Sequence, residues 1–177
     1  MTTAAAPDTA TNTAATANAA PATAPAAPTA PTAPTAVNGR VIALAHYAAR
    51  ALLEGVLDRH GATFHQSVTL RVVTVAGGSI ARDALVRDVT GSLKAEESVV
   101  HGVIGELTSA GLLSQDPAEA SRLHLTAAGR ELYERTTTEA AGITARLYAG
   151  IPAEDLAVAG RVLALVTERA NAEQARP

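Results

Sequence analysis

An abrupt change of composition at about residue 37 constrains the fold of this chain more than any other feature. Of the first 36 residues, 16 are Ala, ten are Thr and six are Pro, and none is Leu, Ile, Val or aromatic. Such a segment buries too little apolar surface to offset the entropy of ordering it. We therefore expect a disordered Ala/Thr/Pro-rich tail over residues 1–38 and a folded domain over residues 39–177.

The composition excludes several classes of protein. The chain has no Cys, which excludes disulfides, cysteine-based zinc sites and thiol catalysis. Its four aromatic residues are too few for a platform that stacks single-stranded nucleic acid, and its net charge of −3 argues against non-specific coating of nucleic acid. The sequence has neither a long apolar run nor a secretory signal, so we expect a cytoplasmic protein with no membrane partner.

The sequence has no signature of catalysis or of metal binding. It lacks a P-loop and the GxSxG and GxGxxG motifs, so we expect no enzyme, no catalytic residue and no cofactor. The five His residues do not recur at a spacing that gathers metal ligands within one element, so we expect no metal site.

Apolar residues at spacings of three and four predict helices over 41–60, 81–90, 96–110 and 127–149, and a last helix whose first residue is Pro152. Two short strands over 112–114 and 122–125, on either side of the turn QDPAEAS, predict a β-ribbon. Residues 63–76 are ambiguous. Thr63 and Gln66 form a capping box that favours a helix, whereas the β-branched run VTLRVVTV favours a strand.

This order of elements is that of a winged helix-turn-helix flanked by helical arms. The stretch VVHGVIGELTSAGLLS, the short turn and then SRLHLTAAGREL resemble the core of the MarR family of regulators. Its reading helix ends in Leu-x-x-x-Gly-Leu, here 107–112, and its wing leads to Leu-Thr-x-x-Gly, here 125–129. The segment IPAEDLAVAGRVLALV is similar to the family's last dimerisation helix, so the resemblance covers about residues 40–170.

The resemblance implies a mainly α fold: a winged helix-turn-helix core over about 63–126, a two-stranded β-wing, long dimerisation helices, and a helix at 63–76. It implies a homodimer that places two reading helices about 34 Å apart on a pseudo-palindromic double-stranded DNA site. It also implies a small aromatic or acidic ligand in a crevice between the dimer helices and the DNA-binding lobe. The residues expected to bind that ligand are His46, Tyr47, Arg50, His65 and Arg71. His46 and Arg50 also fit a solvated polar stripe with Glu54 and Asp58, so both interpretations stay open.

The DNA-contacting candidates are Lys94, Ser98, His101 and Arg122, but this surface departs from the family. Residues 80–126 hold four basic and seven acidic side chains, so their net charge is −3. The wing's usual Asp-x-Arg has Ala120 at the aspartate position, although Arg122 is kept. The resemblance predicts a ligand-responsive DNA-binding regulator that acts as a repressor, whereas the acidic segment favours an alternative. The alternative is a protein of the same fold that has lost DNA reading and binds or transforms a small molecule in the crevice.

Overall fold

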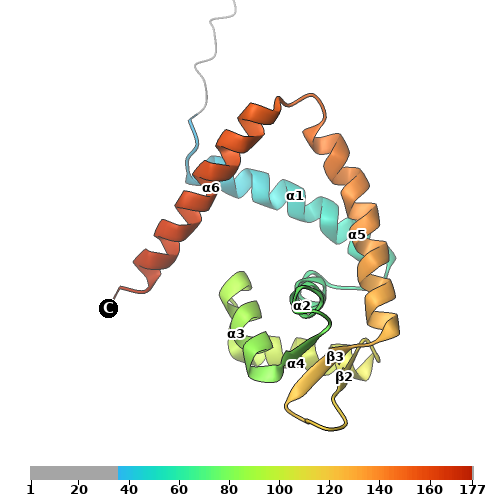
Figure 1. Ribbon diagram of the computed structural model, residues 1–177. Helices are drawn as coiled ribbons and strands as arrows, with labels where there is room; N and C mark the ends of the chain where they lie inside the picture. Colours follow the sequence, from blue (N-terminus) through green and yellow to red (C-terminus); the bar gives the residue numbers. More distant parts are fainter. Residues whose placement is uncertain (1–35, 177) are drawn as a thin grey trace, which may run out of the picture. The chain divides into compact units, whose positions relative to one another are not determined.

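The computed structural model describes residues 36–176, which form six helices and three short strands (Figure 1). The expected tail lies outside the described residues except for positions 36–38, so its boundary stays a prediction. In chain order the elements are α1 Gly39–Arg59, α2 Phe64–Val75, β1 Ser79–Ala81, α3 Arg82–Leu93, α4 Glu97–Ser109, β2 Leu113–Gln115, β3 Arg122–Leu125, α5 Ala127–Tyr148 and α6 Ala153–Gln174.

The ambiguous segment forms the helix α2, as the resemblance implied. Its capping box is complete: the Thr63 hydroxyl accepts from the Gln66 amide at 3.2 Å, and the Gln66 side chain accepts from the Thr63 amide at 3.0 Å. The helix buries Thr69, Leu70 and Val73 on one face. Burial at helical spacing therefore outweighs the β-branched content of the segment, because tertiary packing overrides a weak local propensity.

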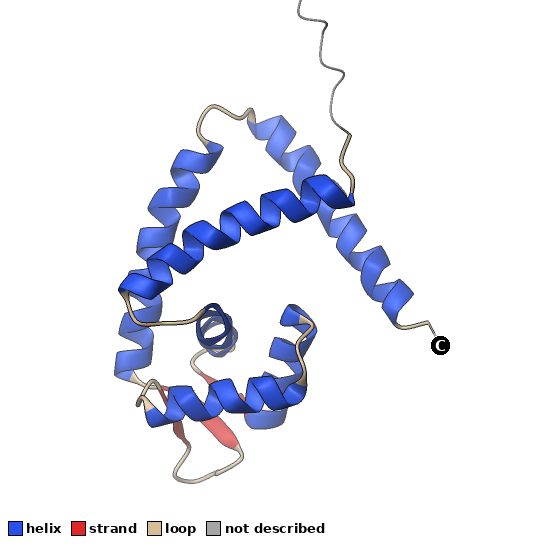
Figure 2. Ribbon diagram, turned by 180° about the vertical axis from the view of Figure 1, so that it is seen from behind, coloured by secondary structure: helices blue, strands red, loops and turns tan. Residues whose placement is uncertain are grey.

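The core of the winged helix lies where α2, α3 and α4 meet the sheet (Figure 2). Leu70, Leu85, Ile104, Leu107 and Leu123 are all at most 1% exposed. Each such side chain contributes about 1.5–3 kcal/mol when it leaves water. Because α3 and α4 both pack on this core, the turn between them is fixed at both ends. The opposite side of α4 does not contact the core.

The sheet has one strand more than the two-stranded wing that the sequence predicts. Its order is β1-β3-β2, with antiparallel pairing that places Ser79 and Ser114 on either side of His124. β1 has only three residues and runs directly into α3, so no alternating pattern marks it. Its central residue, Ile80, joins the hydrophobic core.

The start of α6 also differs from the prediction. Pro152 is the N-cap rather than the first helical residue, with an extended ψ of 140°. Its carbonyl accepts from the amides of Asp155 and Leu156, both at 3.1 Å, which is the role of a cap. Gly150, at φ +80°, makes the preceding turn in a region that few other residues adopt.

α6 has no buried residue, and only Leu156 is partly covered. Exposed apolar side chains occur on α6, on α1 and at the end of α5, and together we call them the apolar face. The apolar face consists of Leu44, Tyr47, Leu52, Leu147, Tyr148, Ile151, Val158, Val162, Leu163, Leu165 and Val166, each between 38% and 65% exposed.

The Leu-Thr-x-x-Gly motif joins the wing to α5. The Thr126 hydroxyl donates to the Gly111 carbonyl at 2.7 Å and accepts from the Gly129 amide at 3.0 Å, which caps α5. Gly129 packs directly against the Leu112 backbone, and a Cβ there would lie 2.9 Å from Leu125 Cδ1 and closer still to the Leu112 carbonyl oxygen. This junction has no room for a side chain.

We predict that Gly129→Ala lowers the free energy of unfolding by about 1–3 kcal/mol, because the added methyl must displace backbone. Gly142→Ala is the matched control in the same helix, since its Cβ would meet only the end of Arg146 at 3.9 Å. It should raise the stability by about 0.5–1 kcal/mol. Urea denaturation of both variants checks this, and equal effects would contradict the packing argument.

Candidate functional site

A crevice between α1 and α5 is the first candidate binding site, and we call it the first chamber. It has a volume of about 330 Å³ and is walled mainly by apolar side chains. The lining residues are His46, Ala49, Arg50, Leu52, Leu53 and Val56 of α1, Phe64 of α2, and Ala140, Ile143, Thr144, Leu147 and Tyr148 of α5.

A second chamber of about 380 Å³ adjoins the first and shares Leu53, Phe64 and Ala140 with it. Its wall is also mainly apolar, but it adds several hydroxyl groups and a second cation. These polar residues are Ser67, Arg71, Tyr133, Thr136 and Thr137. The two chambers together offer a mainly apolar pocket with a few polar groups, which is the usual composition of a small-molecule site.

The two arginines of the crevice differ in whether their guanidinium groups already bind another side chain. Arg50 Nε donates to Glu54 Oε1 at 2.9 Å, and its guanidinium lies 4.5 Å from the centre of the Phe64 ring. Arg71 makes no hydrogen bond or ion pair with any described residue. A carboxylate ligand therefore meets a neutralised cation in the first chamber and an unpaired one in the second.

The structure brings three of the five expected ligand residues to the crevice. His46 and Arg50 line the first chamber and Arg71 lines the second. Tyr47 is 65% exposed and lines neither, and the His65 ring packs on Phe64 with the ring centres 6.2 Å apart. The sequence places the start of the long helix at this crevice but singles out no residue of it, because nothing local indicates which face of α5 meets α1. The structure adds Tyr133, Thr144 and Tyr148 to the lining.

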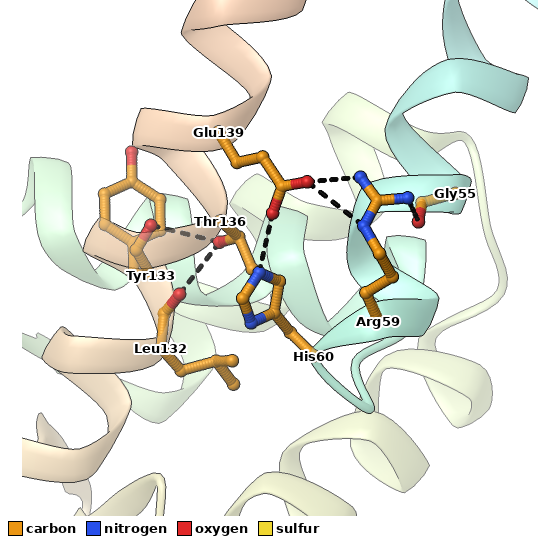
Figure 3. Close-up of polar contacts among 7 residues, drawn as sticks. All are labelled: Gly55, Arg59, His60, Leu132, Tyr133, Thr136 and Glu139. Atoms are coloured by element: carbon orange, nitrogen blue, oxygen red, sulfur yellow. Dashed lines mark hydrogen bonds and ion pairs between the residues drawn. The ribbon is translucent and has the colours of Figure 1, made fainter.

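A cluster around Glu139 fixes the end of α1 on α5 (Figure 3). Both Nε and Nη2 of Arg59 donate to Glu139 Oε1, the former at 3.1 Å, and His60 Nε2 lies 2.9 Å from Oε2. Arg59 also donates to the Gly55 carbonyl at 2.6 Å. Since Glu139 directly precedes Ala140, which lines both chambers, this cluster sets where α1 and α5 begin to diverge.

The donors of this cluster hold the pKa of Glu139 below its ordinary value of 4.5, with the Arg59 hydrogen bonds as the largest cause and His60 as the next. A carboxylate with a lowered pKa stabilises the fold above its ordinary pKa. That contribution is lost as the pH falls through the lowered value, because protonation then breaks the bonds to both donors.

We predict that Glu139→Gln lowers the Tm at pH 7 and that the difference from the unchanged protein shrinks toward about pH 3. Glu131→Gln is the control, since Glu131 on the same helix makes only an exposed pair with Arg135 at 3.5 Å. Thermal melts across this pH range give the comparison. A Tm difference that stays constant with pH would show that the Glu139 charge is not responsible.

The DNA-facing candidates lie on and around α4. Ser98 and His101 are exposed on its outer side, beside Gly102 and Gly105. Lys94 occupies the turn between α3 and α4 at φ +53°, a left-handed conformation that is uncommon for a lysine. The turn therefore holds an exposed cation directly before the N-terminal end of α4.

The turn of the wing, residues 116–121, is ordered by an aspartate other than the expected one. Asp116 Oδ1 accepts from the amides of Ala118 at 2.7 Å and Glu119 at 3.2 Å, and Oδ2 lies 2.6 Å from His124 Nε2. The His124 hydrogen bond is the largest cause of a lowered pKa at Asp116. Asp116 thus supports the wing from the start of its turn, although Ala120 offers no carboxylate.

Arg122 lies along the sheet rather than at the tip of the wing. Its Nε and Nη2 both donate to the Ser79 hydroxyl of β1 at 3.3 Å, and Glu119 lies 4.0 Å away. A contact with DNA requires this side chain to exchange Ser79 for phosphate or base.

Residues 36–176 contain no group of three or more His, Asp and Glu side chains close enough to hold a metal ion. In the same part of the chain, no helix is long and apolar enough to cross a membrane.

Comparisons with known proteins identify the fold. No family model matches the sequence, and no curated protein is recognisably similar to it. Three similar solved structures are a MarR-family transcriptional regulator from Rhodococcus sp. RHA1, CouR from Rhodococcus jostii RHA1 bound to p-coumaroyl-CoA, and Bordetella bronchiseptica BpsR, whose DNA binding is regulated by 6-hydroxynicotinic acid.

These structures match with TM-scores of 0.62, 0.63 and 0.59 and identities of 18%, 17% and 23%, respectively. Each match covers 73% of this chain, and it covers 92%, 90% and 91% of the respective relative. At this level of identity the likeness concerns the fold. The described chain therefore has the winged helix-turn-helix fold of the MarR-family transcription regulators.

Proposed function

We propose that this protein is a ligand-responsive, DNA-binding transcription regulator that acts as a homodimeric repressor on a pseudo-palindromic operator. The observation that carries the proposal is the position of α4. Its apolar side, with Val100, Ile104 and Leu107, is buried in the core, while Ser98 and His101 face outward behind the turn at Lys94. A helix held in this way can enter the major groove of DNA.

The apolar face supports the homodimer. Helix α6 places apolar side chains over about half of its circumference, and a single helix of this kind is marginal in water. If two copies of α6 pair antiparallel about Val162, Asp155 of one copy stands level with Arg169 of the other. A parallel pair would place like charges together, so charge favours the antiparallel arrangement.

The charge of the DNA-facing lobe limits how tightly such a dimer binds. With four basic and seven acidic residues over 80–126, few phosphates can be neutralised, and non-specific affinity depends mainly on that neutralisation. We assign the contacts to Lys94, Ser98, His101 and Arg122. Specific binding then depends more on base contacts from Ser98 and His101 than it does in a basic regulator.

The crevice supports control by a small aromatic carboxylate or phenolate. Its apolar first chamber fits an aromatic body, and Arg71 in the second chamber is free to bind an acidic group. Relief of repression follows if the ligand prefers a dimer geometry in which the two α4 helices no longer match adjacent major grooves. The regulator BpsR, which has this fold, responds to 6-hydroxynicotinic acid.

The second candidate is a protein of the same fold that binds or transforms a small molecule and no longer reads DNA. The acidic DNA-facing lobe and the Ser79-bound Arg122 favour it. The two functions differ in one direct observable, which is specific DNA binding.

We predict that the protein binds DNA from upstream of its own gene at sub-micromolar concentration, more tightly than scrambled DNA, and that added salt weakens this binding. Arg122→Ala should weaken it several-fold and flatten the salt dependence, and Arg135→Ala, a change on α5, is the control. Fluorescence anisotropy over a salt series measures both effects. Should a library of genomic fragments also yield no specific site, the second candidate replaces the first.

We predict that, within a panel of hydroxylated benzoic, phenylacetic and nicotinic acids, the acids that raise the Tm do so through Arg71. Arg71→Gln should remove most of that rise, because it removes the unpaired cation. Arg50→Gln should have a smaller effect on binding, since Arg50 is already paired with Glu54. Thermal shift measurements show which variant loses more of the rise in Tm that the acid causes. A larger loss in Arg50→Gln than in Arg71→Gln would place the acid in the first chamber.

A further inference from the structure

One large apolar side chain is exposed on the DNA-facing lobe. Over residues 80–126, all of which the structure describes, every Leu, Ile and Val is buried or half-buried except Val99, which is 45% exposed. Its neighbour Val100 is 1% exposed and belongs to the hydrophobic core. Val99 lies in the first turn of α4, outside the apolar face, so the proposed homodimer does not account for its exposure.

Little else on the outer side of α4 can reach a base edge. Gly102 and Gly105 are exposed, and a Cβ added at either glycine would meet no other part of the chain within 4 Å. The Glu106 carboxylate already accepts from Gln66 Nε2 of α2 at 3.0 Å. Since reading helices contact bases mainly through their N-terminal residues, the first turn of α4 and His101 are the parts best placed to do so.

We propose that Val99 contacts the C5 methyl group of a thymine and so sets a preference for thymine at one position in each half of the operator. This inference rests on the proposed function, in which α4 enters the major groove. Among the four bases of DNA, only thymine presents a methyl group in that groove, and apolar side chains contact it. A valine side chain makes no hydrogen bond, so this methyl is the group through which it distinguishes one base from another.

The charge of the lobe gives such a contact more weight. With four basic and seven acidic residues over 80–126, phosphate neutralisation adds little affinity. Contact between a methyl group and the Val99 side chain withdraws apolar surface of both from water and needs no cation. Because it releases no counterions, the preference for thymine should persist as added salt weakens the overall binding.

Uracil in place of thymine tests the proposal, since it removes the methyl group and leaves the hydrogen-bonding groups of the base unchanged. The probe is the tightest-binding duplex from the library of genomic fragments, prepared with thymine throughout and again with one thymine at a time replaced by uracil. Fluorescence anisotropy gives the Kd of each duplex. At the contacted position uracil should weaken binding about three- to fivefold, the effect of one methyl group withdrawn from an apolar contact.

Val99→Ala completes the comparison. It should weaken binding to the thymine duplex several-fold and remove the uracil effect at the same position, so that the two changes are not additive. Val75→Ala is the control, because Val75 is a valine at the end of α2 that is 77% exposed. It should keep both the affinity and the uracil effect. Since neither valine belongs to the hydrophobic core, circular dichroism should show that both variants stay folded.

Each other outcome contradicts the proposal in a distinct way. Equal Kd values for thymine and uracil at every position would overturn thymine recognition and leave the DNA-binding function standing. A uracil effect that persists in Val99→Ala would show that another group, or the shape of the DNA, senses the methyl. A library that yields no specific site would overturn the proposed function and this inference with it.

Discussion

The exposed apolar face along α1, the end of α5 and α6 is the feature on which the proposed dimer depends most. The winged helix has its own core in α2, α3, α4 and the sheet, whereas α6 has no buried residue at all. A helix of 22 residues with this many exposed apolar side chains needs a partner surface to persist in water. In the proposed function, dimerisation and the spacing of the two α4 helices both depend on how that face is covered.

The Glu139 cluster connects α1 and α5, which carry part of the apolar face, to the winged helix. It holds the last turn of α1 on α5, and only four residues, 60–63, separate α1 from α2. Both chambers lie beside this junction and share Ala140, the residue after Glu139. A change in the angle between α1 and α5 would therefore move α2 through this short link. Since α2 packs on α3 and α4, those helices would move with it.

The helices other than α2 are predictable from apolar spacing because each gathers its apolar side chains on one side, but the site is only partly predictable. The capping box at Thr63 gave the correct start of α2, whereas β1 left no signal because it has three residues and no turn of its own. Arg50 and Arg71 were both candidates by residue type. Only the structure separates them, since the partners of Arg50 come from one turn along α1 and from the ring of Phe64 on another helix. The wing is a second example, because Asp116 in its turn orders it through a contact with His124 of β3, which sequence spacing alone does not specify.

Amide hydrogen exchange of α6, followed as a function of protein concentration, tests the central claim most directly. We expect residues 153–174 to be protected at micromolar concentration to a degree comparable with α2 and to lose that protection on dilution, while α2 keeps it. Such a result ties the order of α6 to a second copy. Rapid exchange of α6 at every concentration, with α2 protected throughout, would contradict the claim that two copies of this chain cover each other's apolar face.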